Sequence, residues 1–199
     1  MKLSSLLYNS GVNAGPSRDL PVAAVSPFSA ADVEAILRER GWLTAEATTE
    51  INEWMRDAAE WLGIQAALHS VNEERAALTE LLSLVFSYDA AKMLESKDSQ
   101  AVMAREGARD VIRELANRVL GDGDVDSERF REIVAALKGI LGSHGRMIFY
   151  PLRLALAGRT GEGELDRVIL LLDRAAKLPF AARVKGTQER MLEFCAALR

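Results

Sequence analysis

The sequence predicts a compact all-helical bundle, and three observations support this fold class. Apolar residues recur at three- and four-residue spacing along most of the chain, which is the period of amphipathic helices. No stretch between turn signals alternates apolar and polar residues, so strands should be rare or absent. Hydrophobic residues make up 49% of the 199 residues, which is enough to bury a core.

The chain is expected to begin with an extended or mobile segment, residues 1–28, followed by a helical body, residues 29–199. The first segment has no sustained helical period and contains Gly11, Gly15, Pro16, Pro21 and Pro27. A turn that starts at Gly121 would divide the body into two subdomains, 29–120 and 121–199.

The first helix is predicted to start at a capping box and to end at Gly41. Ser29 and Asp32 have the spacing with which a hydroxyl and a carboxylate satisfy free amides at a helix start. Gly41 suits the left-handed conformation that closes many helices.

Further apolar stripes predict the remaining helices. Trp54 and Trp61 lie seven residues apart on one helical face, so we interpret them as core residues rather than stacking platforms for bases. A terminal helix is expected over 187–199, with Met191, Leu192, Cys195 and Leu198 as its apolar face. The internal stripes are Ile51, Trp54, Met55, Ala58 and Leu62; Leu78, Leu81, Leu82, Val85 and Phe86; Val111, Ile112, Leu115 and Val119; Phe130, Ile133, Val134 and Leu137; Leu152 and Leu156; and Leu165, Val168, Ile169 and Leu172.

Several function classes find no support in the sequence. No apolar run approaches the roughly 20 residues that span a bilayer, so we expect a cytoplasmic protein with no membrane partner. The single Cys195 cannot form an internal disulfide. No nucleophile elbow, phosphate loop or dinucleotide fingerprint occurs, so neither an enzyme nor a cofactor is indicated.

A metal site is not expected either. Asp122, Asp124 and Asp126 have the start of a calcium-loop spacing, but Ser127 and Ile133 occupy the positions that require glycine and glutamate. An acidic turn with Ser127 as the N-cap of the next helix explains them better. The two histidines, at positions 69 and 144, lie far apart and lack a cysteine cluster.

Charge is distributed unevenly along the chain. The net charge is −4, yet the segment from Arg146 to Arg199 carries 10 Lys or Arg against 6 Asp or Glu. This basic end is the better candidate for RNA contact, although solvated helix faces explain such an imbalance equally well.

The segment from Gly145 to Gly161 carries the candidate binding residues. Pro151 predicts a nearby helix start and Gly158 a left-handed helix end, which places Arg153 in the first turns of a short helix between glycine-bearing loops. An arginine beside free backbone amides suits phosphates or base edges. The alternative is an ordinary salt bridge or an exposed helix end.

The same segment resembles the Pro-Leu-Arg-x-Ala-Leu-Thr-Gly motif near the C-terminus of bacterial glutamyl-tRNA synthetases. The following segment, Glu164 to Leu172, looks like the family's leucine-rich helix, and Glu74 to Leu81 is similar to an upstream segment. The resemblance covers about residues 30–185. The motif is matched by Pro151, Leu152, Arg153, Ala155, Leu156 and Gly158.

This resemblance implies a helical cage that grips the anticodon loop of a tRNA. It places Arg153 and Leu165 at positions that contact anticodon bases, and Arg75 near a position where an arginine reads the third base. Ala157 departs from the family's Thr, and Glu162-Gly163 replaces its Thr-Pro or Gly-Pro pair. The His-Ile-Gly-His and Lys-Met-Ser-Lys-Ser signatures of the catalytic half are absent from the sequence.

We therefore expect a free-standing tRNA-binding protein that uses no metal or cofactor and does not aminoacylate by itself. The candidate RNA-binding residues are Arg153, Leu165, Arg75, Arg146 and Arg159. Three alternatives remain. The chain is the noncatalytic subunit of a split synthetase with a separately encoded catalytic chain, a diverged protein-binding scaffold, or a fragment of a larger gene product.

Overall fold

The computed structural model describes residues 26–67, 73–121, 123–142 and 144–199, and these ranges contain ten helices and no strand. The predicted fold class is confirmed. Of the segment expected to be extended, residues 1–25 lie outside the described ranges. The helices are α1 (Ala30–Glu39), α2 (Thr49–Ala66), α3 (Glu74–Phe86), α4 (Ala90–Leu94), α5 (Lys97–Met103), α6 (Ala108–Val119), α7 (Ser127–Leu141), α8 (Arg146–Ala157), α9 (Glu164–Lys177) and α10 (Thr187–Ala197).

Local signals in the sequence set several helix ends. The capping box of α1 is confirmed, because the Ser29 amide donates to the Asp32 carboxylate over 2.8 Å and the Asp32 amide donates to the Ser29 hydroxyl. Hydrogen bonds from the amide and hydroxyl of Ser29 lower the pKa of Asp32. The predicted N-cap of α7 was wrong by one residue: Asp126, not Ser127, accepts from the free amides, since its carboxylate reaches two of them.

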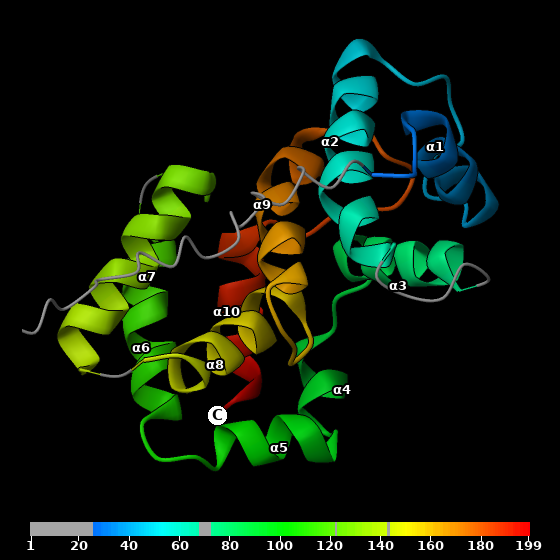
Figure 1. Ribbon diagram of the computed structural model, residues 1–199. Coiled ribbons are helices and arrows are strands. Elements are labelled where there is room, and N and C mark those ends of the chain that lie inside the picture. The colour runs from blue at the N-terminus through cyan, green and yellow to red at the C-terminus, as the bar shows by residue number, and fades with distance from the viewer. Residues whose placement is uncertain (1–25, 68–72, 122, 143) are drawn as a thin grey trace, which may run out of the picture.

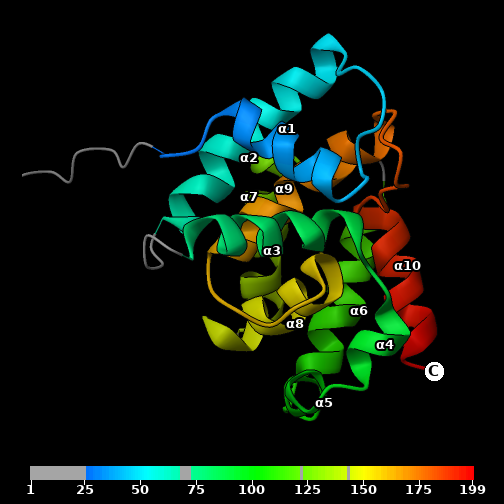
Figure 2. The ribbon, with the colours of Figure 1, turned by 90° about the vertical axis from the view of Figure 1, so that its right-hand side faces the viewer.

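The helix α9 lies in the middle of the molecule (Figures 1 and 2) and packs against α2, α3 and α8. All residues of the predicted internal stripes are buried. Trp54 of α2 is fully buried beside Phe86 and Phe180, and its indole Nε1 donates to the Leu171 carbonyl of α9 over 3.1 Å. The core interpretation is thus confirmed for Trp54, whereas Trp61 is only partly buried.

The terminal helix α10 is held at its start by a carboxylate from α9. Asp173 accepts hydrogen bonds from the amide and hydroxyl of Thr187, and from the Val125 amide that precedes α7. Glycine is needed at position 186, because a Cβ there would lie 2.8 Å from the Asp173 carboxylate. One side chain therefore joins α9, α10 and the start of α7.

The predicted apolar face of α10 was partly wrong. Met191 is buried, but Leu192 is 58% exposed, and the helix instead buries Thr187, Arg190 and Phe194. Cys195 is partly buried, and this burial raises the pKa of its thiol. The burial of a charged residue such as Arg190 has no signal in a hydrophobic pattern, which is why the face was misplaced.

Within the described residues, no helix is both long enough and apolar enough to cross a bilayer.

We predict that Trp54→Phe lowers the free energy of unfolding by about 2 kcal/mol, because it shrinks a buried ring and removes the bond to Leu171. The matched variant Trp61→Phe, on the same helix but partly exposed, should cost less than about 1 kcal/mol. Urea denaturation followed by circular dichroism measures both. Equal losses would contradict the assignment of Trp54 to the core.

Candidate nucleic-acid interface

The helix α8 is longer than predicted and does not start near Pro151. It begins at Arg146, so Pro151 is its sixth residue and Arg153 lies in its second half. Pro151 has no N–H for the Met147 carbonyl, but its ring is buried and its packing offsets that loss. The predicted end is confirmed: Gly158 has φ +83° and closes α8.

Arg153 is anchored inside the protein rather than presented to solvent. Its Nε and Nη2 donate to the two carboxylate oxygens of Asp166 over 2.7 and 2.9 Å, and Nη1 donates to the Gly161 carbonyl over 2.8 Å. The residue is 6% exposed, and its guanidinium lies 4.7 Å from the centre of the Phe149 ring. The salt bridge considered for Arg153 is therefore present and joins α8 to α9, while the Nη1 bond holds the α8–α9 loop, residues 158–163, against α8.

Leu165 is also inside the protein. It is fully buried in the first turn of α9, and the α8–α9 loop lies directly against it. A Cβ at Gly161 would come within 2.8 Å of the Leu165 Cδ1, so the loop can make this approach only with glycine. Arg153 and Leu165 thus fix the path of the loop from two sides.

The other predicted arginines point outward, and each is paired with a carboxylate. Arg159 of the loop pairs with Glu80 of α3, and Arg146 pairs with Glu162 over 3.2 Å. Arg75 pairs with Glu39 over 2.6 Å. The side chain of Arg146 is 72% exposed, whereas that of Arg159 is 36% exposed.

These arginines follow one another across the surface. Glu80 borders two depressions, one lined by Arg75 and the other by Arg159 and Glu162. Beyond Glu162 lie Arg146 and then Tyr150, whose ring has the Arg105 guanidinium 5.3 Å from its centre. We name Arg75, Arg159, Arg146 and Arg105 the arginine strip.

Tyr150 is a surface residue that the sequence analysis missed. Its hydroxyl donates to Glu162 over 3.2 Å, and two guanidinium groups, those of Arg105 and Arg146, lie within 6 Å of its ring centre. An aromatic ring among arginines can contact bases as well as phosphates. The signal was present as an aromatic residue four positions after Arg146, but Arg105 is contributed by a distant part of the chain.

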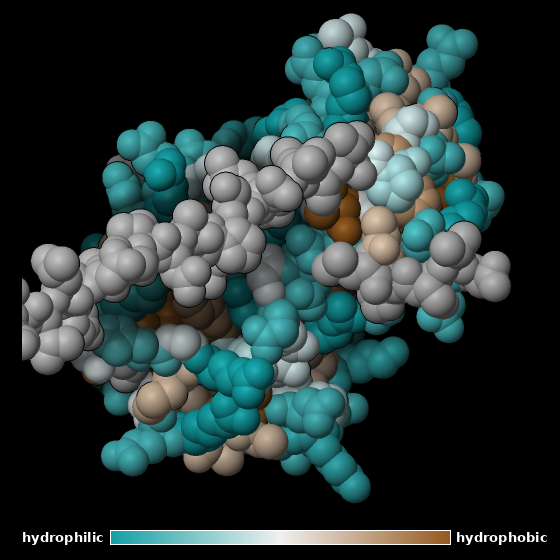
Figure 3. All heavy atoms as spheres, in the orientation of Figure 1, coloured by the Kyte–Doolittle hydropathy of each residue, from teal (hydrophilic) through white to brown (hydrophobic). Residues whose placement is uncertain are grey.

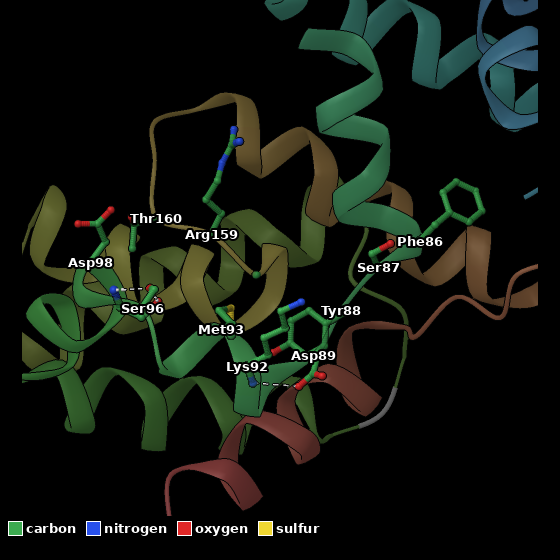
Figure 4. A pocket seen from close by; sticks show the side chains of 12 residues that line it. Phe86, Ser87, Tyr88, Asp89, Lys92, Met93, Ser96, Asp98, Arg159 and Thr160 are labelled. Atoms are coloured by element: carbon green, nitrogen blue, oxygen red, sulfur yellow. Dashed lines mark hydrogen bonds between the residues drawn. The ribbon is translucent and has the colours of Figure 1, made fainter. Parts of the chain in front are cut away.

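A cleft of about 710 Å³ opens beside the α8–α9 loop (Figure 4). One side is formed by the α3–α4 connection, Ser87–Asp89, and the other by Gly158, Arg159 and Thr160. Lys92 and Met93 of α4 also line it, and the Arg159 side chain points away from Met93 (Figure 4). The lining offers hydroxyls, an apolar floor and charges of both signs.

The residues considered for a metal site are occupied in other ways. Asp124 pairs with Lys177, and Asp126 caps α7. His144 is exposed, while His69 and Asp122 lie outside the described residues. The described ranges contain no group of three or more side chains that could hold a metal ion.

The chain shows distant similarity to part of several glutamate–tRNA ligases. It is 27% identical over 128 residues to glutamate–tRNA ligase 2 of Syntrophus aciditrophicus, which covers 64% of this chain and 25% of that protein. It is 26% identical over 108 residues to the ligase of Carboxydothermus hydrogenoformans, covering 54% of this chain and 22% of that protein. It is 25% identical over 142 residues to the ligase of Bacillus pumilus, which covers 71% of this chain and 28% of that protein.

The chain therefore spans about a quarter of the length of the curated relatives it matches. No family model and no solved structure matches it.

We predict that Arg153→Lys lowers the free energy of unfolding by about 2 to 4 kcal/mol, since a lysine cannot form the bidentate bond and leaves Asp166 poorly paired. Hydrogen exchange of residues 158–163 should rise. Arg113→Lys is the control, because Arg113 is 72% exposed beside Asp110 and should cost less than about 0.5 kcal/mol. Unchanged exchange in the loop would refute the anchoring role of Arg153.

Proposed function

We propose that this protein binds the anticodon arm of a tRNA across the arginine strip. The observation that carries the proposal is the placement of Arg75, Arg159 and Arg146 on one connected surface, although they come from α3, the α8–α9 loop and α8. The similarity to glutamate–tRNA ligases, proteins named for a tRNA substrate, supports the same reading. Outside the grey atoms, the face drawn in Figure 3 is mostly hydrophilic, with hydrophobic surface only in separate areas.

The arginine strip would bind phosphates, and the ring of Tyr150 would bind a base. Guanidinium groups hold phosphate oxygens with paired hydrogen bonds, and unstacked loop bases bind aromatic rings and arginine planes. Arg153 and Leu165 contribute indirectly, by holding the α8–α9 loop and hence Arg159 in place. Direct base contact by either residue would require the loop to move, because both are buried.

Carboxylates set the strength of the interaction. RNA must replace Glu39, Glu80 and Glu162 as partners of the strip, and each exchange lowers the net gain in affinity. We therefore expect moderate affinity with a strong dependence on salt, since bound counterions are released when phosphates are neutralised. This arrangement also disfavours indiscriminate binding to nucleic acids.

A protein-binding scaffold is the second candidate function. It is favoured by the carboxylate pairing of the strip and by three large apolar side chains that are more than half exposed, Ile140, Met147 and Leu192. A scaffold would bind no tRNA at low salt while remaining folded. The same binding experiment therefore separates the two functions.

We predict that a tRNA transcript binds at low salt and that a bare anticodon stem-loop competes, whereas an acceptor minihelix does not. Arg159→Gln should weaken binding about fivefold, since it removes one phosphate partner, while Glu80→Gln should strengthen it by a similar factor. Fluorescence anisotropy at two salt concentrations measures these changes.

The control is Arg118→Gln on α6, because Arg118 is 35% exposed and paired with Glu114, much as Arg159 is with Glu80. Its affinity should stay within about twofold of the parent. Equal effects of the Arg159 and Arg118 substitutions would remove the strip from the binding surface. Absence of tRNA binding by the folded parent would favour the scaffold.

We further predict that the purified chain forms no adenylate with ATP and any amino acid, because its sequence lacks both nucleotide-binding signatures of the synthetases. A pyrophosphate-exchange assay against a no-protein blank measures this. If the chain is the noncatalytic subunit of a split synthetase, adding the separately encoded catalytic chain should restore tRNA charging. Exchange by this chain alone would contradict the proposal.

A further inference from the structure

Arg190 of α10 is a fully buried arginine whose partners are main-chain carbonyls. Its Nη2 donates to the carbonyls of Leu84 and Val85 over 2.9 and 2.7 Å, and its Nη1 donates to the Leu156 carbonyl over 2.8 Å. Its Nε donates to the Lys185 carbonyl over 2.9 Å. One guanidinium thus joins α10 to the last turns of α3 and α8.

The location explains why a cation is tolerated there. The last turn of a helix exposes carbonyls without helical partners and carries partial negative charge. Arg190 donates hydrogen bonds to such carbonyls of two helices. Its guanidinium also lies 4.6 Å from the centre of the Tyr88 ring. Burial lowers the pKa of Arg190 to about 10, so it remains charged at neutral pH.

The two helix ends that Arg190 joins lead directly into the two sides of the cleft. After α3 come Ser87, Tyr88 and Asp89, and after α8 come Gly158 and Arg159. The sides are also linked to each other, because the Tyr88 hydroxyl donates to the Ala155 carbonyl. A Cβ at Gly158 would lie 3.3 Å from the Tyr88 ring, which shows how closely the sides approach.

We infer that Arg190 is a positioning residue that sets the two sides of the cleft and, through the end of α8, the place of Arg159 on the arginine strip. The inference rests on the proposed RNA binding for its functional part. Arg190 itself is fully buried and contacts no RNA. Its contribution is to remove alternative positions of Arg159 before the RNA arrives, so that less conformational entropy is lost on binding.

Lysine cannot replace Arg190 in this role, although it keeps the charge. A single ammonium group cannot span carbonyls of two different helices in the way that the two ends of a guanidinium do. Arg190→Lys should therefore release one helix end. This separates positioning from any electrostatic effect on RNA, since the net charge of the protein does not change.

The test compares Arg190→Lys with Ile36→Ala, which removes buried apolar volume in α1, a helix that packs against α2. Two quantities are measured below the melting temperature of each variant: hydrogen exchange of residues 87–93 and 158–163, and the Kd for the tRNA transcript. We expect Arg190→Lys to speed exchange in both segments and to weaken binding about tenfold, whereas Ile36→Ala changes neither despite comparable destabilisation.

If Arg190→Lys does not fold, Tyr88→Phe takes its place, because it removes only the Tyr88 hydroxyl, which donates to the carbonyls of Ala155 and Arg190. Exchange in both segments should then rise, and tRNA binding should weaken, by less than in Arg190→Lys. Unchanged exchange in both segments would overturn the positioning role, as would equal losses of affinity in Ile36→Ala. Faster exchange with unaltered tRNA affinity would overturn its functional part. Faster exchange together with a parent that binds no tRNA would preserve the positioning role and reject the proposed function.

Discussion

The buried guanidinium of Arg190 holds the centre of this fold together, and the acceptors of its described hydrogen bonds are all main-chain carbonyls. Arg190 takes its compensation from the carbonyl ends of α3 and α8, and so it brings two helices that are distant in sequence to one point. The charge makes the arrangement specific, because an apolar residue there would leave the carbonyls without these donors. Around this point the cleft, the α8–α9 loop and the terminal helix acquire fixed relative positions.

The α8–α9 loop shows how a second arginine divides structural and surface roles. Arg153 holds the loop from inside through Asp166 and the Gly161 carbonyl, while Arg159 within the loop faces solvent and Glu80. Arg153 is structural because it lies on the buried face of α8, whereas Arg159 is a surface residue because it lies beyond the end of that helix. A recognition surface built in this way carries its exposed arginine on a loop that is held in place from inside the protein.

Similarity to glutamate–tRNA ligases extends over about a quarter of those proteins, and the RNA contact that we propose lies at the arginine strip. The strip is unlike a uniformly basic patch, because Glu39, Glu80 and Glu162 alternate with its arginines. Such alternation favours a partner whose phosphates match the arginine positions over one that is merely anionic. It also makes the proposed RNA binding compatible with a net charge of −4.

The longer helices, most of the residues that fill the core and several helix ends could be predicted from the sequence, since apolar period, capping side chains and left-handed glycines act over one or two turns. Ser29, Asp32 and Gly158 were readable for that reason. The short helices α4 and α5 could not be predicted, because neither is long enough to show an apolar period. Which polar residues are buried could not be predicted from the sequence. Arg190 and Arg153 are buried because distant carbonyls and Asp166 receive them, Pro151 is accepted within α8 because its ring is packed, and Leu192 is exposed because α10 turns Arg190 to the core. These outcomes depend on partners far along the chain, and no local pattern carries that information.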